Sequence, residues 1–185
     1  MAKIITPVFR CSYLHVFEPH LDPNDNLKYS VSMLFPKDST DMGPIKEAIK
    51  EAIVDRWGSD KKKRPKGLKT PLKDGDDRDD ENYAGHWYIN ASANENRKPG
   101  IVDAKLDPIF DPMSFYSGCY ARASVNFYAY DNVSKGVGCG LNNIMMVKEG
   151  EPFGTPNVKP EEDFAEFASA STSTDTDEDS NDLGF

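Results

Sequence analysis

Two stretches near the start of the chain alternate between apolar and polar side chains, which is the spacing of a β-strand. The first runs from Val8 to Phe17, and the second, from Lys28 to Phe35, places Tyr29, Val31, Met33 and Phe35 on one face. Between them, residues 18–26 (EPHLDPNDN) are dense in the residue types that form turns. We therefore predict a β-hairpin over residues 8–35.

The pattern changes to a helical period after Pro44. Apolar residues recur there at helical spacing, at Ile45, Ala48, Ile49, Ala52, Ile53 and Trp57. Pro44 suits a first helical turn and Gly58 a C-terminal stop. Because the other positions are charged, we predict one amphipathic helix that buries a single face against the body.

Strand patterns return in the second half of the chain. They cover residues 86–91, 100–102, 116–130 and 138–147, and Asp131-Asn132 forms a turn between the last two. Several short strands with turn-rich connections and one helix predict a mainly β fold, an antiparallel barrel with an inserted helix and a long charged loop.

That loop is expected over residues 58–82, where opposite charges are segregated. Seven Lys and Arg residues lie from Lys61 to Lys73, and acids occupy residues 74–81 except at Gly75 and Arg78. Leu68 and Leu72 are the only aliphatic residues between residues 59 and 81. Such a stretch buries too little apolar area to offset its ordering entropy, so we predict a mobile loop.

The net charge of −9, from 31 acids and 22 bases, argues against nucleic-acid binding when it is taken as an average over the chain. The positions of the charges change this interpretation. Nine of the acids follow Pro160, where no Lys or Arg occurs, so the remainder of the chain is neutral. We predict one domain over residues 1–157 and a disordered acidic tail over residues 158–185.

Cysteine usage and hydropathy indicate an intracellular protein. The three cysteines include no C-x-x-C pair, which argues against a disulfide framework or a zinc site. No apolar run reaches the length of a membrane span, and the first seven residues lack the apolar core of a signal peptide. We expect a cytoplasmic protein with no membrane partner.

The strand near residue 125 carries the most informative chemistry, because Arg122, Tyr128 and Tyr130 share one face. Aromatic rings on an open sheet can stack on any base, and Trp87 or Tyr88 offers a second platform; packing of these rings is the equally weighted alternative. The cations expected to contact phosphates are Arg10, Arg122, Lys135 and, on the charged loop, Lys61, Lys62, Lys63, Arg64 and Lys66.

Catalytic signals are weak. The acidic run of residues 74–81 fails the calcium-loop pattern, and the three histidines show no metal or triad spacing. We therefore expect no enzymatic activity, no metal and no cofactor. A metal-dependent nuclease using Asp74–Glu81 and an RNA-binding or protein-interaction barrel are kept as alternatives.

The acidic tail has two interpretations. It adds solubility, or it occupies a basic nucleic-acid groove when that groove is empty. Its aromatic terminus would fit an apolar, basic pocket on a partner, so a partner contact is predicted at Asp179, Asp182, Leu183 and Phe185.

The chain resembles a family of tailed-bacteriophage single-stranded DNA-binding proteins. The resemblance rests on the order of segments across most of the body, among them RCSYLHVFEP, KYSVSMLFPKD, IKEAIKEAI, YSGCYARASVNFYAYD and KGVGCGLNN. It implies an elaborated OB-fold, sequence-independent binding of single-stranded DNA in phage DNA replication and recombination, and the cytoplasm of the infected host. It also implies recruitment of a polymerase or a helicase/primase by the tail, and it leaves a homodimer open. The charged residues 59–81 depart from the family pattern.

Overall fold

The computed structural model describes residues 2–153 and 160–168. The chain divides into two units, Met1–Phe153 and Gly154–Phe185. The strands of the first unit are β1 (Ala2–Ile5), β2 (Phe9–Leu21), β3 (Leu27–Pro36), β4 (Lys73–Asp74), β5 (His86–Asn94), β6 (Gly100–Val102), β7 (Tyr120–Asp131) and β8 (Lys135–Lys148), and its α-helix is α1 (Gly43–Trp57).

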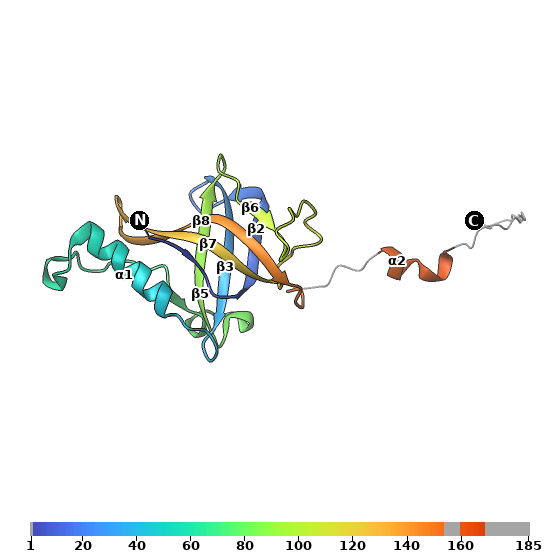
Figure 1. The fold of residues 1–185 in the computed structure, drawn as a ribbon, viewed down its shortest axis with the longest axis horizontal. Coiled ribbons are helices and arrows are strands. Elements are labelled where there is room, and N and C mark those ends of the chain that lie inside the picture. Colours follow the sequence, from blue (N-terminus) through green and yellow to red (C-terminus); the bar gives the residue numbers. More distant parts are fainter. Residues whose placement is uncertain (1, 154–159, 169–185) are drawn as a thin grey trace, which may run out of the picture. The chain divides into compact units, whose positions relative to one another are not determined.

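Five strands close into a ring in the order β2, β3, β5, β8, β7 (Figure 1). Neighbours in the ring are antiparallel except β5 and β8, which run parallel and pair at Ser92 and Gly140. This is the strand arrangement of an OB-like barrel, which confirms the predicted mainly β fold and the hairpin. The purely antiparallel expectation is wrong for β5–β8 and for β6–β8, because parallel pairing leaves no local sequence signal.

The barrel is filled from the predicted strand faces. Tyr29, Val31, Met33 and Phe35 of β3 are all buried. Val31, Met33 and Phe35 belong to the same apolar cluster as Val125 and Phe127 of β7. Because side chains alternate along a strand, Ser30, Ser32, Tyr128 and Tyr130 belong to the opposite, outer face. The interior therefore leaves a separate outer face for a ligand.

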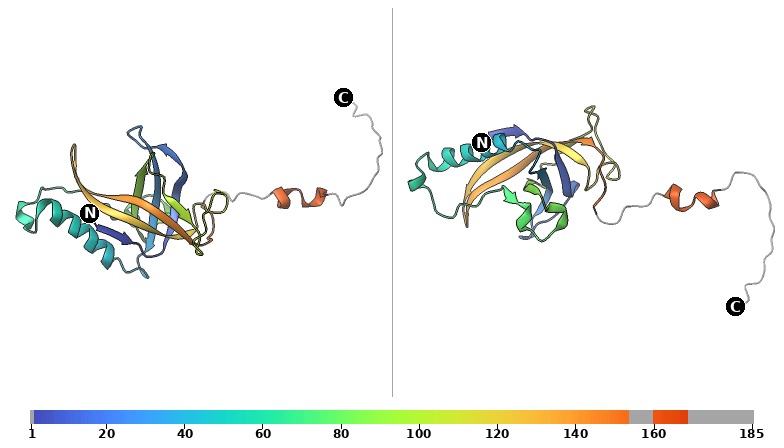
Figure 2. Two further views of the ribbon diagram at one scale, coloured as in Figure 1. Left: turned by 45° about the horizontal axis from the view of Figure 1, so that its top comes forward. Right: turned by 90° about the horizontal axis from the view of Figure 1, so that it is seen from below.

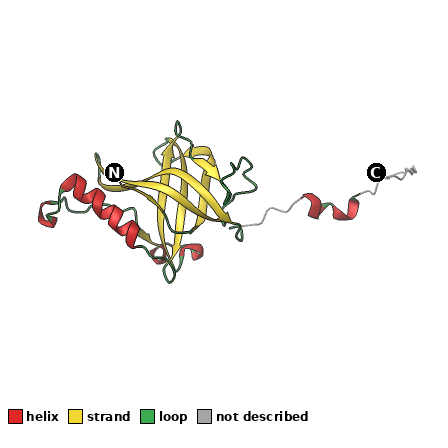
Figure 3. Cartoon of the chain, in the orientation of Figure 1, coloured by secondary structure: helices red, strands yellow, loops and turns green. Residues whose placement is uncertain are grey.

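Helix α1 packs on the barrel through the predicted face, burying Ile45, Ala48, Ile49 and Ala52. It lies beside β1 and the β7–β8 hairpin (Figure 2) and is the one long helix in the cartoon (Figure 3). Gly58 follows with a φ of 85°, a conformation that stops the helix at little cost only for glycine.

Part of the stretch predicted as a mobile loop over residues 58–82 is bonded to the barrel. The backbone of Lys69 bonds to Lys135 and Val137, and β4 pairs with β5. Leu72 packs on the core, and Gly75 is buried where an added Cβ would lie 2.0 Å from the Tyr83 carbonyl oxygen. A few buried anchors thus position a segment whose composition alone indicates disorder.

The described part of the second unit comprises α2 (Pro160–Asp163) and a 3-10 turn at Ala165–Phe167. Phe164 and Phe167 are exposed. The prediction of a disordered acidic tail over residues 158–185 stays a prediction. The predicted partner residues Asp179, Asp182, Leu183 and Phe185 lie outside the described residues. No helix among the described residues is long and apolar enough to cross a membrane.

Candidate nucleic-acid interface

Two hollows on the outer face of the barrel share one residue, Asn90 of β5, and together form what we call the groove. The arginine hollow, of about 250 Å³, is lined by Tyr13, Ser30, Val31, Ser32, Arg78, Tyr83 and Asn90. The glycine hollow, of about 520 Å³, is lined by Leu68, Lys69, Thr70, Pro71, Lys73, Asn90, Tyr130, Val137, Gly138 and Cys139. The groove therefore crosses β3, β5 and β8, the face with which OB barrels bind oligonucleotides.

Small side chains make the floor of the groove. In the β3–β5 ladder, Ser30 is paired with Ser92 and Ser32 with Asn90. On β8, glycines at 136, 138 and 140 pair with Tyr130, Tyr128 and Asn126 of β7. Short side chains at alternate positions leave room above the sheet that larger ones would fill.

The Tyr128 ring lies next to Gly138 and Gly140 of this floor. A Cβ at position 138 would be 2.7 Å from the Tyr128 ring, whereas one at position 140 would be 3.7 Å away. Only glycine at 138 therefore permits this ring position, and Tyr128 as a whole residue is 38% exposed. Burial raises the pKa of the Tyr128 phenol, so the ring stays uncharged at neutral pH. An uncharged, partly exposed ring is suited to stacking on a base.

Arg78 is surrounded by tyrosines in the arginine hollow. Its guanidinium carbon lies 4.3 Å from the ring centre of Tyr83 and 5.6 Å from those of Tyr13 and Tyr88. The Tyr83 hydroxyl is 3.0 Å from Oγ of both Ser12 and Ser32, donating to one and accepting from the other. These contacts fix the cation at the wall of the groove.

Tyr13 reaches the groove through an irregularity in β2. Its φ of 47° is rare for a residue with a side chain, and the β2–β3 register shifts between Ser12 and His15. Tyr13 is 55% exposed. The bulge thus aims an aromatic ring outward beside Arg78.

The described residues that line the two hollows include three cations, Lys69, Lys73 and Arg78, and no carboxylate. Lys69 and Lys73 are exposed lining residues of the glycine hollow. Nearby, Lys37 forms ion pairs with Asp74 and, at 2.7 Å, with Asp76. Hydrogen bonds from Lys37 lower the pKa of both carboxyl groups, so these two acids are already neutralised by a partner.

The predicted cations fall mostly outside the groove. Among the loop cations Lys61, Lys62, Lys63, Arg64 and Lys66, none lines either hollow, and Arg64 donates to the carbonyl oxygens of residues 58 and 59. Lys135 lies 3.6 Å from Asp131. Arg122 is exposed and donates to the Thr6 carbonyl oxygen.

Three other predicted site residues have structural contacts that the sequence did not indicate. Arg10 donates to the carbonyl oxygens of Gly118 and Glu151 and stacks 4.1 Å from the Phe153 ring centre. Trp87 packs against the core, with the Lys37 ammonium 4.7 Å from its ring centre. Tyr88 is only 8% exposed, so its ring is not open to a base. Of the predicted platforms, the groove contains Tyr130 and, over its floor, Tyr128.

Sequence reasoning missed Tyr13, Arg78 and Asn90 as lining residues. Arg78 did carry a signal, because it is the single cation within the acidic run of residues 74–81. Tyr13 gave none, since its orientation depends on a bulge that the alternating pattern conceals. Lys69 and Lys73 belonged to the basic run but not to the part of it assigned to the site.

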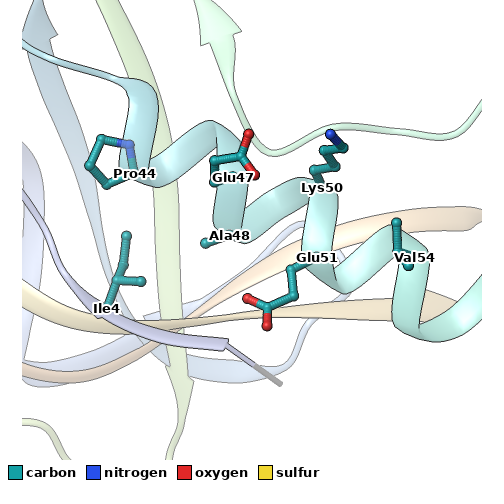
Figure 4. A pocket seen from close by; sticks show the side chains of 7 residues that line it. All are labelled: Ile4, Pro44, Glu47, Ala48, Lys50, Glu51 and Val54. Atoms are coloured by element: carbon teal, nitrogen blue, oxygen red, sulfur yellow. The ribbon is translucent and has the colours of Figure 1, made fainter. Parts of the chain in front are cut away.

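A third hollow, beside α1, has a different character (Figure 4). It is lined by Ile4, Pro44, Glu47, Ala48, Lys50, Glu51 and Val54, in a space of about 340 Å³. Two carboxylates at its edge disfavour a polyanion. Within residues 2–153 and 160–168, no three His, Cys, Asp or Glu side chains are placed to hold a metal ion.

Comparison with known proteins decides the family. The family model described as "Enterobacter phage Enc34, ssDNA-binding protein" matches residues 2–180. The chain belongs to this family of phage single-stranded DNA-binding proteins. The predicted resemblance is thereby confirmed, and because homologues in the Enc34 family are non-enzymatic, so is the prediction that the protein is not an enzyme.

Individual relatives of this Enc34-family protein are also phage proteins. "Putative protein p50" of Acyrthosiphon pisum secondary endosymbiont phage 1 is 34% identical and covers 87% of this chain and 91% of its own. The single-stranded DNA-binding protein from bacteriophage Enc34, solved in complex with ssDNA, has 27% identity and a TM-score of 0.68, over 82% of this chain and 89% of that one. The protein gp2.5 of bacteriophage T7 shares the fold at 14% identity, with a TM-score of 0.61, over 95% and 99% of the two chains.

Proposed function

We propose that the protein binds single-stranded DNA in the groove and does so without regard to sequence. The observation that carries this proposal is the ring of Tyr128 lying over Gly138, on the same outer face as the cation Arg78. Family membership supports DNA as the ligand, and the side chains of the groove support its position.

The glycine hollow would hold bases. Tyr130 lines it, and the Tyr128 ring lies next to its lining residue Gly138. Each ring has a π-face on which any base could stack, at roughly 1–3 kcal/mol per base. Asn90, where the two hollows meet, carries the amide most available for contacts with a base edge or a sugar. Stacking without a dense set of directional partners gives sequence-tolerant binding.

The cations at the walls would hold the backbone. Arg78 presents a guanidinium fixed by three rings, and Lys69 and Lys73 stand on a segment bonded to β8 and β5. Each cation that neutralises a phosphate releases counterions and makes the affinity fall with salt.

Binding affinities for three nucleic acids test this function. Fluorescence polarisation of a labelled single strand, a duplex and an RNA of equal length would be compared across a salt series. We expect the single-stranded DNA to bind most tightly. Preference for the duplex would refute the groove as a single-strand site, and preference for RNA would favour the RNA-binding alternative.

A role in replication or recombination, with the tail as competitor and recruiter, is a further part of the proposal. It is supported by the nine acids after Pro160, which lie in a segment without Lys or Arg. Deleting residues 161–185 should tighten binding of single-stranded DNA, most visibly at low salt, because an anion that competes for the groove is removed. Unchanged or weaker binding would count against tail competition.

The terminal aromatic allows a separate test of recruitment. Removing Phe185 alone should leave DNA affinity unchanged and abolish capture of a replication polymerase or helicase. Equal recruitment by both forms would contradict the assigned role of Asp179, Asp182, Leu183 and Phe185.

A further inference from the structure

Two histidines of β2 stack on each other next to the arginine hollow. The ring centres of His15 and His20 are 4.0 Å apart, with an angle of 29° between the planes. His15 is paired with Ser30 across the hairpin, and Nε2 of His20 lies 3.5 Å from Ser30 Oγ. Because Ser30 also lines the arginine hollow, the histidine pair adjoins one end of the groove.

The irregular register of β2 brings the two rings together. The β2–β3 ladder shifts between Ser12 and His15 and again between His15 and His20. In a regular strand, residues five apart point to opposite faces and their rings cannot stack. The bulges therefore place two imidazoles where an unbroken hairpin would place one.

One ring nitrogen of the pair lacks a hydrogen-bond partner in the part of the chain that the structure describes. Nδ1 of His20 is buried and has no hydrogen-bond partner among the described residues. Burial, and then the charge of His20, lower the pKa of His15, so this ring is neutral near pH 7 in the free protein.

The neighbouring charged groups do not replace such a partner. Lys28 is opposite His20 on β3, and its ammonium lies 3.8 Å from the Asp22 carboxylate. Asp22 also accepts from the backbone N–H groups of residues 24 and 26. Beyond β3, the paired residues of β5 are Ser92 and Asn94, which do not titrate. On the arginine-hollow side, the titratable or charged side chains are Tyr13, Tyr83 and Arg78.

We propose that the His15–His20 pair is a phosphate-contacting end of the groove and that it takes up a proton when single-stranded DNA binds. This inference rests on the proposed function and adds a residue pair and a pH dependence to it. A phosphate beside the pair stabilises an imidazolium, and the stacked rings disfavour two charges at once, so one proton is taken up for the pair.

The sign of the pH dependence follows from linkage. The protonated form is favoured in the complex, so the pKa of the pair is higher with DNA than without. Affinity is therefore constant above the pKa of the complex, rises as the pH falls through it, and levels off below the pKa of the free protein. One proton gives at most about a tenfold rise in affinity per pH unit.

The test is the affinity of the full chain for an oligo-dT strand between about pH 5.5 and pH 8, the range in which histidines titrate. Thymine neither gains nor loses a proton there. Wild type is expected to bind about tenfold more tightly at the low end. The double variant His15→Gln, His20→Gln should lose this gain. His86→Gln is the matched control, because His86 is the remaining histidine of the chain and should leave the gain unchanged.

A second variant and a second readout guard against a folding defect. His15→Phe keeps a ring in the stack but cannot share a proton, and it should reduce the pH dependence. Calorimetry at about pH 6.5 in two buffers of different ionisation enthalpy should show uptake of about half a proton by wild type and His86→Gln, since a tenfold gain corresponds to a pKa rise of about one unit. His15→Phe should take up less.

Two results would overturn the inference: a wild-type affinity independent of pH, or the wild-type pH dependence retained in the double variant. The proposed function fails separately, if wild type does not bind oligo-dT at pH 8 at all. Tight binding at pH 8 with no gain at low pH leaves the groove in place and removes only the histidine pair from it.

Discussion

The arginine hollow and the glycine hollow lie on one sheet face, yet they use tyrosine in opposite ways. In the arginine hollow, Tyr83 is fully buried and Tyr88 nearly so, and their rings surround a guanidinium. Beside the glycine hollow, Tyr128 lies next to Gly138 and is partly exposed. The same residue type thus positions a charge in one half of the groove and offers a stacking surface in the other.

This difference shows why a count of aromatic residues does not locate a base-binding site. A ring that is enclosed contributes to stability and to the position of its neighbours, whereas a ring over a glycine is free on one side. If the comparison is right, loss of rings in the glycine hollow reduces affinity at all salt concentrations, whereas loss of charge reduces the dependence on salt.

The largest effect is expected from Tyr128→Ala combined with Tyr130→Ala. Loss of two platforms removes about 1–3 kcal/mol per stacked base, so affinity for single-stranded DNA should fall at least about tenfold with little change in salt dependence. Fluorescence polarisation measures this. The double phenylalanine variant keeps both rings and should bind like wild type; equal binding by the alanine variant would contradict stacking here.

The next largest effect is expected from removing positive charge in the glycine hollow. Lys69→Gln with Lys73→Gln should reduce the slope of log affinity against log salt by about 2, since each lysine that contacts a phosphate contributes about one unit. Lys61→Gln with Lys62→Gln removes the same charge from residues that line neither hollow. If the control pair changes the slope more than Lys69→Gln with Lys73→Gln does, the phosphate contact lies at Lys61–Lys66, as the sequence predicted.

Arg78→Gln removes one charge from the arginine hollow, and the slope should fall by about 1. Thermal unfolding should show a modest loss of stability, because three cation–ring contacts are lost at about 0.5–1 kcal/mol each for partly exposed sites. An unchanged salt slope would mean that Arg78 has a structural role alone.

The smallest effect is expected from Gly138→Ala. The new methyl group would lie 2.7 Å from the Tyr128 ring and must displace it. Affinity should therefore fall by roughly fivefold, about 1 kcal/mol for one displaced platform. Gly140→Ala is the matched control at 3.7 Å and should bind like wild type. Equal affinities for the two variants would show that the position of the ring is not used.

The sequence predicted those features that depend on local periodicity. The buried face of β3, the face and both ends of α1, and Tyr128 and Tyr130 on one side of β7 all follow from spacing. Features that depend on distant contacts were missed. The bulge at Tyr13 and the anchors of residues 68–83 arise from pairing with other strands, which no local pattern encodes. Trp87 and Tyr88 show the same limit, because adjacent strand residues face opposite sides and only the fold reveals what covers each.

The central claim, that DNA lies in the groove, is tested most directly by photo-crosslinking the full chain to an oligonucleotide of 5-iododeoxyuridine and mapping the modified residues by mass spectrometry. The account predicts crosslinks at Tyr128 and Tyr130, with Tyr13 at the other end, and none at the buried Tyr29. Crosslinks confined to residues beside α1, around the hollow at Ile4 and Val54, would contradict it.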